Sequence, residues 1–339
     1  MKYTIIFTSV ILALSSCSQP DQLNYFKLAG FAQGTSYHIT YGHPDSINYQ
    51  ASIDSILRDF DLSLSSYEPA SVLSKINRNE DDRIDSKFRE VYQVAVEVNE
   101  KSQGAFDLTV MPLVNAWGFG PGRKTQMDQE VIDSILTFVG MEKIRLEGDR
   151  IIKMDNGVSI DVNAIAQGYS VDIVASFLEE KGIKNYMVEI GGEVKTRGKN
   201  PKGEIWKIGI DRPEFGNFLP GMQMQAIIEL NEKALATSGN YRKFYEEDGV
   251  KYSHSIDPKT GYPVRSDILS ATIVAESCMK ADAYATACMV MGLEKSKAMI
   301  GNLENTEAYL IYGDEAGQYQ VWMTPGFSKF ILRETAGRE

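Results

Sequence analysis

Two side chains in the C-terminal third of the chain have the types and the spacing to hold a hard cation. Asp282 and Thr286 are four residues apart, so on a helix they lie on the same face. A carboxylate and a hydroxyl suit Mg²⁺, which takes one or two oxygens from a protein and completes its coordination with water and substrate phosphates. The alternative is that Asp282 is the N-cap of a helix of small residues and that Thr286 bonds back to a backbone carbonyl.

A second polar cluster stands where a helix is expected to begin. Asp161 and Asn163 follow a predicted strand and precede the helical pattern of Ala164 to Lys181. The N-terminus of a helix offers unpaired N–H groups and the positive end of the helix dipole, which together favour an anion. The alternative is that Asp161 or Asn163 is an ordinary N-cap residue.

The histidine His254 lies in a segment rich in hydroxyl groups that ends in the sequence DPKTG. Such a sequence is typical of a tight turn. His254 could act as a base, with Asp257 as the group that orients it; the alternative is a turn with an exposed histidine. Hydroxyl groups and aromatic rings also gather in segments that could hold a phosphate or a flat ring, or could simply form loops: 65–69, 104–109 and 237–241.

The elements that must position these residues follow from hydrophobic periodicity. A strand pair is predicted over Phe26 to Tyr41, with a turn near Gly34. Helices are predicted at Ile53–Phe60, Ser86–Lys101, Met127–Phe138, Ala164–Lys181 and Ala281–Met291. Further strands are predicted at Lys143–Leu146, Arg150–Met154, Val158–Val162, Tyr186–Ile190, Trp206–Ile210, Gln223–Leu230, Tyr252–Ile256, Leu269–Val274, Ala308–Tyr312 and Tyr319–Met323.

Strands and helices are mixed along the chain without a regular βαβ alternation. This order favours an α+β fold in which mixed, mostly antiparallel sheets are flanked by helices. No repeat or linker divides the sequence, so we expect one compact domain over residues 24–334.

Composition excludes several classes of protein. The chain has 339 residues, 35 Lys and Arg against 46 Asp and Glu, and a formal net charge of −11. That charge argues against binding nucleic acid through a basic surface, and a phosphate-rich ligand would need a metal ion or backbone amides. Three cysteines and three histidines form neither a disulfide framework nor a zinc site. The glycine signatures of Rossmann and P-loop sites are absent.

The N-terminus is typical of an exported protein. Residues 3–14 are mostly apolar and follow a lysine, which predicts a signal peptide over residues 1–16. The residues before Cys17 resemble a bacterial lipobox, which predicts a lipid on Cys17 and a tether over residues 17–23. The alternative is an ordinary secretory signal in which Cys17 is incidental. A lipidated chain would be anchored to a bacterial membrane, with its catalytic domain on the extracytoplasmic (periplasmic) side.

Taken together and in order, these segments resemble the ApbE family, the FAD:protein FMN transferases. The resemblance covers nearly the whole mature chain, behind the lipobox. Its pieces are Gly34–Thr35, Ser65–Tyr67, Gly104–Asp107, Asn115–Gly120, Asp161–Asp172, Gly191–Val194, Thr237–Tyr241, His254–Gly261 and Ala281–Ala287.

The resemblance implies an ApbE-like domain that transfers FMN from FAD to a Ser or Thr hydroxyl of an acceptor protein and releases AMP. The acceptor would be a flavoprotein, such as a subunit of a membrane redox complex. Mg²⁺ would be held by Asp282, Thr286 and the carbonyl of Ala164. His254 matches the family's proposed base, and Asp257 could orient it or replace it. The residues at FAD-contacting positions are Gln33, Tyr67, Ala105, Phe106, Asp107, Asp161, Gln167 and Ile256.

Two positions depart from the family pattern. Many members carry lysine at the position of Gln167 and methionine at that of Gln33. Without the lysine, more of the phosphate charge would be neutralised by the metal. Two other functions would use the same site: an Mg²⁺-dependent FAD pyrophosphatase that yields FMN and AMP, and a lipoprotein that binds FAD without chemistry.

Overall fold

The computed structural model of the chain describes residues 23–213, 223–239, 244–247, 250–253, 255–314 and 318–334, and gives 244–247 and 250–253 as backbone only. Several predictions lie outside the described residues: the signal peptide, the lipidation site Cys17, most of the tether and the candidate base His254. In the described part, no helix is long and apolar enough to cross a membrane.

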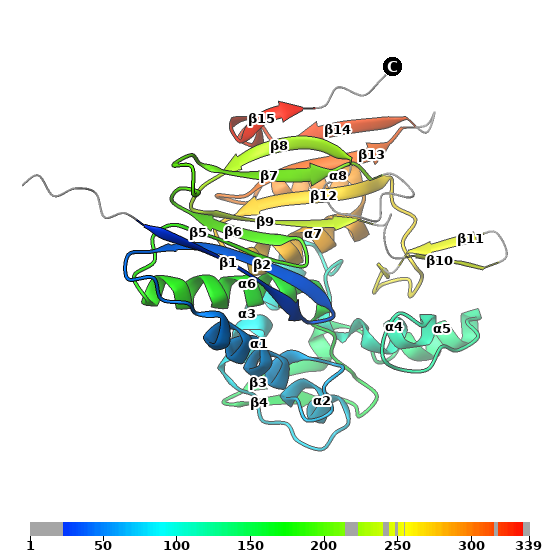
Figure 1. Cartoon of the computed structure of the whole chain (residues 1–339). Coiled ribbons are helices and arrows are strands. Elements are labelled where there is room, and N and C mark those ends of the chain that lie inside the picture. Colours follow the sequence, from blue (N-terminus) through cyan, green and yellow to red (C-terminus); the bar gives the residue numbers. More distant parts are fainter. Residues whose placement is uncertain are drawn as a thin grey trace, which may run out of the picture.

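An eight-stranded sheet is the centre of the fold (Figure 1). Every strand pair in it is antiparallel. In spatial order its strands are β1 (Asn24–Ala32), β2 (Thr35–His43), β5 (Tyr186–Ile190), β6 (Glu193–Arg197), β9 (Lys233–Gly239), β12 (Ile268–Ala275), β13 (Glu307–Gly313) and β14 (Tyr319–Met323).

Three smaller sheets complete the strands. The first has the order β15 (Ile331–Glu334), β8 (Met224–Leu230) and β7 (Trp206–Asp211). The others are the hairpins β3 (Ile144–Glu147) with β4 (Arg150–Lys153) and β10 (Phe244–Glu247) with β11 (Val250–Ser253).

The described helices are α1 (Gln50–Leu64), α2 (Val72–Asn77), α3 (Ser86–Lys101), α4 (Met111–Trp117), α5 (Gln129–Leu136), α6 (Asn163–Glu180), α7 (Cys278–Met291) and α8 (Leu293–Ile300). Helices α6 and α7 pack against the central sheet, α6 on β5 and β6, and α7 on β9 and β12. Figure 1 shows α1 and α3 further from the sheet, beyond α6.

The two faces of the central sheet bury different residues. Neighbours on one strand point to opposite faces, so Ala236 and Ile273 pack toward the helices while Leu235 and Val274 pack toward the three-stranded sheet. Helix α7 lies within the layered core, and ten of its 14 residues are buried. A helix buried on nearly all sides needs apolar residues all round, so the carboxylate of Asp282 is exceptional there.

The architecture confirms the predicted fold class: a single compact α+β domain with antiparallel sheets flanked by helices. The strand pair around Gly34 and the helices at residues 86–101, 164–181 and 281–291 are present, with ends within a few residues of those predicted. Helices and strands that the periodicity did not predict are α2, α4, α8, β6, β9, β10 and β15.

Two strand predictions are wrong in part or whole. Residues Val158 to Val162 form no strand. The N–H and C=O of Ile160 instead bond to the side chain of Asn77, each at 2.8 Å, so an amide side chain satisfies the backbone that a ladder would otherwise satisfy. Strand β11 ends at Ser253, and Ile256 forms only an isolated bridge with Pro263.

Candidate functional site

Helices α6 and α7 are in close contact at Gly168. A Cβ atom built on Gly168 would lie 2.3 Å from the carbonyl oxygen of Cys278 and 2.8 Å from the Cβ of Asp282. Only glycine therefore allows this approach. The contact lets the backbone N–H of Gly168 donate to Oδ2 of Asp282 at 3.0 Å.

The carboxylate of Asp282 is buried, with 6% of the residue exposed. Desolvation raises its pKa to about 7, and the hydrogen bond from Gly168 only partly opposes that rise. In a regular helix the N–H of Gly168 faces the carbonyl of Ala164, one turn earlier. The carboxylate and that carbonyl oxygen are therefore neighbours around one N–H group, which is the oxygen-rich setting that the sequence predicts.

Thr286 extends the polar stripe by one turn of α7. Its Oγ1 lies 3.2 Å from Oγ of Ser238 on β9. The alternative in which Asp282 caps the helix is wrong, because the N-cap is Ser277, whose hydroxyl accepts the N–H of Lys280.

This oxygen set fits a hard cation. A buried carboxylate without a charged partner is costly and is usually paired or bound to a metal, and Asp282 has the hydroxyl of Thr286 one turn away on the same face. Among the described residues no three His, Cys, Asp or Glu side chains form a metal cluster. A cation here would therefore be held by one carboxylate and neutral oxygens, the pattern typical of Mg²⁺ that also binds substrate phosphates.

Asp161 and Tyr67 lie together near the start of α6. The Oδ1 of Asp161 accepts the N–H of Asn163 at 2.8 Å, so it satisfies one free amide of the helix, although the N-cap position belongs to Val162. Burial raises the pKa of Asp161. Burial, and after it the negative charge of Asp161, raises the pKa of Tyr67. Yet 62% of Tyr67 is exposed, so one surface of its ring is open to a ligand.

The loop before the 3₁₀ turn Leu108–Val110 holds the next predicted residues. Asp107 uses its carboxylate within the fold: it accepts the N–H and the hydroxyl of Thr109 and the N–H of Met141. The side chain of Phe106 is buried. A ligand would therefore meet this loop mainly through Ala105 and through backbone groups. The N–H of Asp161 donates to the carbonyl of Leu108 at 2.6 Å, which ties the loop to the start of α6.

Gln167 is a residue of α6, and Gln33 contacts the same helix at Ser170. Gln33 has a positive φ of 53° in the β1–β2 turn, and its Oε1 accepts the hydroxyl of Ser170. Its Nε2 is buried and has no hydrogen-bond partner among the described residues, which leaves a donor for an acceptor on a ligand. Gln167 donates to the carbonyl of Ile190 at 3.2 Å, so its side chain is already tied to β5.

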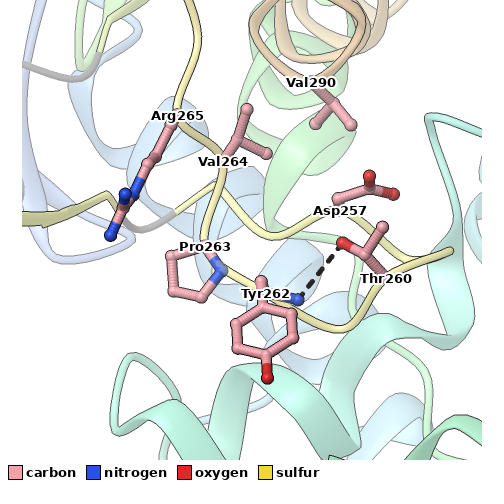
Figure 2. Close-up of a pocket in the computed structure, with 7 residues that line it drawn as sticks. All are labelled: Asp257, Thr260, Tyr262, Pro263, Val264, Arg265 and Val290. Carbon is pink, nitrogen blue, oxygen red and sulfur yellow. Dashed lines mark hydrogen bonds between the residues drawn. The ribbon is translucent and has the colours of Figure 1, made fainter.

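Asp257 forms a turn beside a cavity of about 440 Å³. Its Oδ1 accepts the N–H of Lys259 and its own N–H donates to Tyr262. The side chain of Ile256 is buried in a separate apolar cluster, so a ligand would meet only its backbone. Figure 2 shows the residues that line the cavity: Asp257, Thr260, Tyr262, Pro263, Val264, Arg265 and Val290.

The cavity and the oxygen-rich stripe share one helix face. Val290 follows Thr286 by four residues on α7, so Asp282, Thr286 and Val290 form a single stripe. The structure thus places Asp282 and Thr286 one turn apart on α7, with Asp282 bonded to α6 at Gly168. It groups Tyr67 with Asp161 and the 105–107 loop, and it places Asp257 beside the cavity at the end of the stripe.

Two residues that shape this region received no separate role from the sequence: Gly168 stands within the motif Asp161–Asp172, and Ser238 within the hydroxyl-rich segment 237–241. Their roles depend on partners more than 40 residues away. A glycine inside a helical pattern was the signal available for Gly168, because such a glycine often marks a close helix contact.

The sequence and the fold agree with one family in comparisons with known proteins. A sequence model of the ApbE family matches residues 33–310. A Vibrio cholerae protein named FAD:protein FMN transferase is 37% identical over 98% of this chain and 100% of its own length. A Haemophilus influenzae protein of the same name is 35% identical over 92% and 93%.

Solved structures give the same result. The flavin transferase ApbE from Vibrio cholerae superimposes with a TM-score of 0.82 at 34% identity, covering 91% of this chain and 100% of that one. The flavinyl transferase ApbE from Pseudomonas stutzeri, in its apo form, gives 0.81 at 31% identity, with 93% and 98% covered. This chain belongs to the ApbE family.

Proposed function

We propose that this protein transfers FMN from FAD to a serine or threonine hydroxyl of an acceptor protein and releases AMP, with Mg²⁺ at the Asp282 site. The observation that carries the proposal is the buried Asp282 carboxylate, which faces the start of α6 in a chain of the ApbE family. FAD and its acceptor protein are the partners that the names of the relatives give for those proteins.

Asp282, Thr286 and the Ala164 carbonyl would hold the metal ion. When bound, Mg²⁺ neutralises phosphate charge and polarises the phosphoryl oxygen. That neutralisation matters in a chain of net charge −11, whose own field repels a dinucleotide. Phosphoryl transfer depends on positioning and charge neutralisation more than on covalent chemistry by the protein, and the rigid α6–α7 pair supplies the positioning.

The remaining residues would orient the two substrates. The exposed ring of Tyr67 and the loop at Ala105 would contact the flavin, while the unpaired amide of Gln33 would donate to it. His254 would take the proton of the acceptor hydroxyl, with Asp257 as its orienting group or substitute. The hydroxyl oxygen forms a bond to the FMN phosphorus, the bond from that phosphorus to the bridging oxygen breaks, and AMP leaves with that oxygen.

The location of the protein is a further part of the proposal. A signal peptide over residues 1–16 and a lipid on Cys17 would anchor the protein to a bacterial membrane. The tether 17–23 would then hold the catalytic domain, residues 24–334, on the extracytoplasmic side. An acceptor that is a subunit of a membrane redox complex would be reached from that position.

The decisive experiment incubates the full chain with FAD, Mg²⁺ and a candidate acceptor protein, and detects covalent flavin by fluorescence in a denaturing gel. The expected result is a fluorescent acceptor band and an equal amount of AMP. Asp282→Asn is expected to give no band. Glu97→Gln, a change in α3 at the partner of Lys280 on α7, is expected to give the wild-type band.

Two results would contradict the proposal. Free FMN and AMP without a labelled acceptor would identify a pyrophosphatase, and intact FAD after long incubation would identify a carrier. A normal band from Asp282→Asn would keep the transfer but move the metal site elsewhere.

A further inference from the structure

A second aspartate of α6, Asp172, grips the first turn of α7. Its Oδ2 accepts the N–H of Met279 and the hydroxyl of Ser277, both at 2.9 Å. Its Oδ1 accepts Nζ of Lys195 on β6 at 2.7 Å. The side chains of Lys195 and Asp172 are 21% and 14% exposed, so this is a largely buried carboxylate with three donors.

Asp172 and Gly168 act on successive turns of the same helix pair. They are four residues apart on α6 and therefore share the face that meets α7. Gly168 contacts α7 at Cys278 and Asp282, while Asp172 holds the two groups at Ser277 and Met279. The first turn of a helix has N–H groups without a partner inside the helix, and here a side chain of the neighbouring helix supplies one.

Two contacts between α6 and α7, at Gly168 and at Asp172, restrict the position of α7 more than one contact would. Helix α7 packs on α6, β9 and β12, and the hydrogen bond from Gly168 attaches it to α6 at one point, the Asp282 carboxylate. A second attachment one turn away fixes the rotation and the axial position of α7 relative to the carbonyl of Ala164. A metal ligand must be held within about 0.5 Å of its productive position, and residues behind the ligands commonly provide that constraint.

We propose that Asp172 is a positioning residue for the metal ligand Asp282: through Ser277 and Met279 it locks α7 against α6, so that the Asp282 carboxylate and the Ala164 carbonyl face one cation. This inference rests on the proposed function, because it takes Asp282 as a metal ligand. Lys195 supports this role, because its ammonium group balances the charge of Asp172 and bonds that carboxylate to strand β6 of the central sheet. Asp172 itself contacts neither metal nor substrate.

The test measures Mn²⁺ affinity of the full chain by the electron paramagnetic resonance signal of free Mn²⁺. Asp172→Asn is expected to weaken binding by about 10- to 100-fold, as loss of a supporting partner does at other metal sites. Ser277→Ala removes one of the two bonds of Asp172 to α7, together with the N-cap bond to Lys280, but keeps the bond to Met279, and it is expected to weaken binding less, in the same direction. It also decides the matter if Asp172→Asn fails to fold.

The matched control is Glu97→Gln. Glu97 also holds α7 by an ion pair, with Nζ of Lys280 at 2.8 Å, but from α3. Its loss removes a side-chain contact to α7 but leaves the bonds of Asp172 to Ser277 and Met279 in place, so Mn²⁺ affinity is expected to stay within about twofold of wild type. The concentration of Mg²⁺ required for half-maximal transfer is expected to rise in Asp172→Asn by the same factor as the Mn²⁺ dissociation constant. Thermal unfolding of every variant shows whether it is folded.

The outcomes separate the two proposals. Wild-type Mn²⁺ affinity in a folded Asp172→Asn or Ser277→Ala variant overturns the positioning role, and so does an equal loss in Glu97→Gln, which would show general loosening of α7. If Asp282→Asn binds Mn²⁺ as well as wild type does, the metal site itself is wrong. If Asp282→Asn alone loses binding, the site stands and the role of Asp172 falls.

Discussion

Burial of the ionised Asp282 carboxylate destabilises the folded protein. The carboxylate is buried among apolar helices, and its pKa is raised to about 7 by desolvation. The unfolded chain exposes the same group, whose pKa there is near 3.8. The folded state therefore binds the proton more tightly than the unfolded state does. Stability from this group is complete below about pH 4 and is lost as the pH rises through 7.

A pH dependence follows for the metal-free protein. In a chelator, we expect the free energy of unfolding of wild type minus that of Asp282→Asn to fall between pH 5 and pH 8, by an amount on the order of a few kcal/mol. The variant cancels the contributions of all other titrating groups. The measurement is urea unfolding of both proteins at each pH. A difference that is flat, or that rises with pH, would mean that the carboxylate is well solvated. Saturating Mg²⁺ is expected to stabilise wild type alone at pH 8.

Gln167 makes a second prediction at this scale. Its amide donates to the Ile190 carbonyl and brings no charge to the proposed phosphate site. In Gln167→Lys the ammonium adds one positive charge, so FAD affinity without metal is expected to rise about fivefold, which corresponds to about 1 kcal/mol. The check is FAD titration in EDTA by fluorescence. Gln318→Lys adds the same charge to an exposed loop and is expected to change nothing; an equal gain there would assign the effect to net charge.

The sequence predicts the shared face of Asp282 and Thr286, because four-residue spacing on a helix is a local property. It does not predict what surrounds them. The N–H that binds Asp282 comes from a residue 114 positions away, and the hydroxyl beside Thr286 comes from one 48 positions away. Such contacts depend on tertiary packing. The functional interpretation came instead from a set of ordered motifs.

At the scale of elements, the close contact between α6 and α7 explains why a glycine stands inside the long helix α6. In Gly168→Ala the new Cβ would overlap the carbonyl of Cys278, so the helices must separate. We expect a loss of about 1–3 kcal/mol of stability from overpacking, together with weaker Mn²⁺ binding because the bond to Asp282 lengthens. Chemical denaturation and Mn²⁺ titration measure the two effects.

The control for that variant is Gly313→Ala. Gly313 lies at the end of β13 with open space around it and no positive φ. Its variant is expected to change stability by less than about 0.5 kcal/mol and to leave metal binding unchanged. If Gly168→Ala proves equally neutral, the two helices are further apart or more adaptable than the structure has them.

Helices and strands whose apolar residues repeat with a clear period were predictable from the sequence, and those without such a repeat were not. Helix α3 was predicted with its exact ends, since Phe88, Val91, Ala95 and Val98 repeat at helical spacing. Strands β6 and β9 were missed because they are short of bulky residues and rich in small or polar ones; Thr196 is buried yet bonds to the carbonyl of Leu230. Residues 158–162 have the hydrophobicity of a strand, but the backbone N–H of Ile160 bonds to the side chain of Asn77 and not to a neighbouring strand.

At the scale of the whole molecule, three layers explain how a polar site survives in a core. The three-stranded sheet covers one face of the central sheet with aliphatic and aromatic residues, while the other face meets α6 and α7. The residues proposed for the site lie at the start of α6 and along the α7 stripe, which reaches the cavity beside Asp257 at Val290. The proposed site therefore lies on the helix side of the central sheet, and the three-stranded sheet packs on the other side of strand β9, which carries Ser238.

Attachment of the whole molecule to a membrane is testable apart from its chemistry. The proposed anchor is the N-terminal lipid, whose acyl chains contribute about 0.8 kcal/mol per buried CH₂. In Cys17→Ser, expressed with its signal peptide, we expect the protein to leave the membrane fraction while FMN transfer to a soluble acceptor keeps its wild-type rate. Ser18→Ala is expected to stay on the membrane. Fractionation with the mass of the N-terminal peptide gives the answer, because an unmodified Cys17 in membrane-bound wild type would require a different anchor.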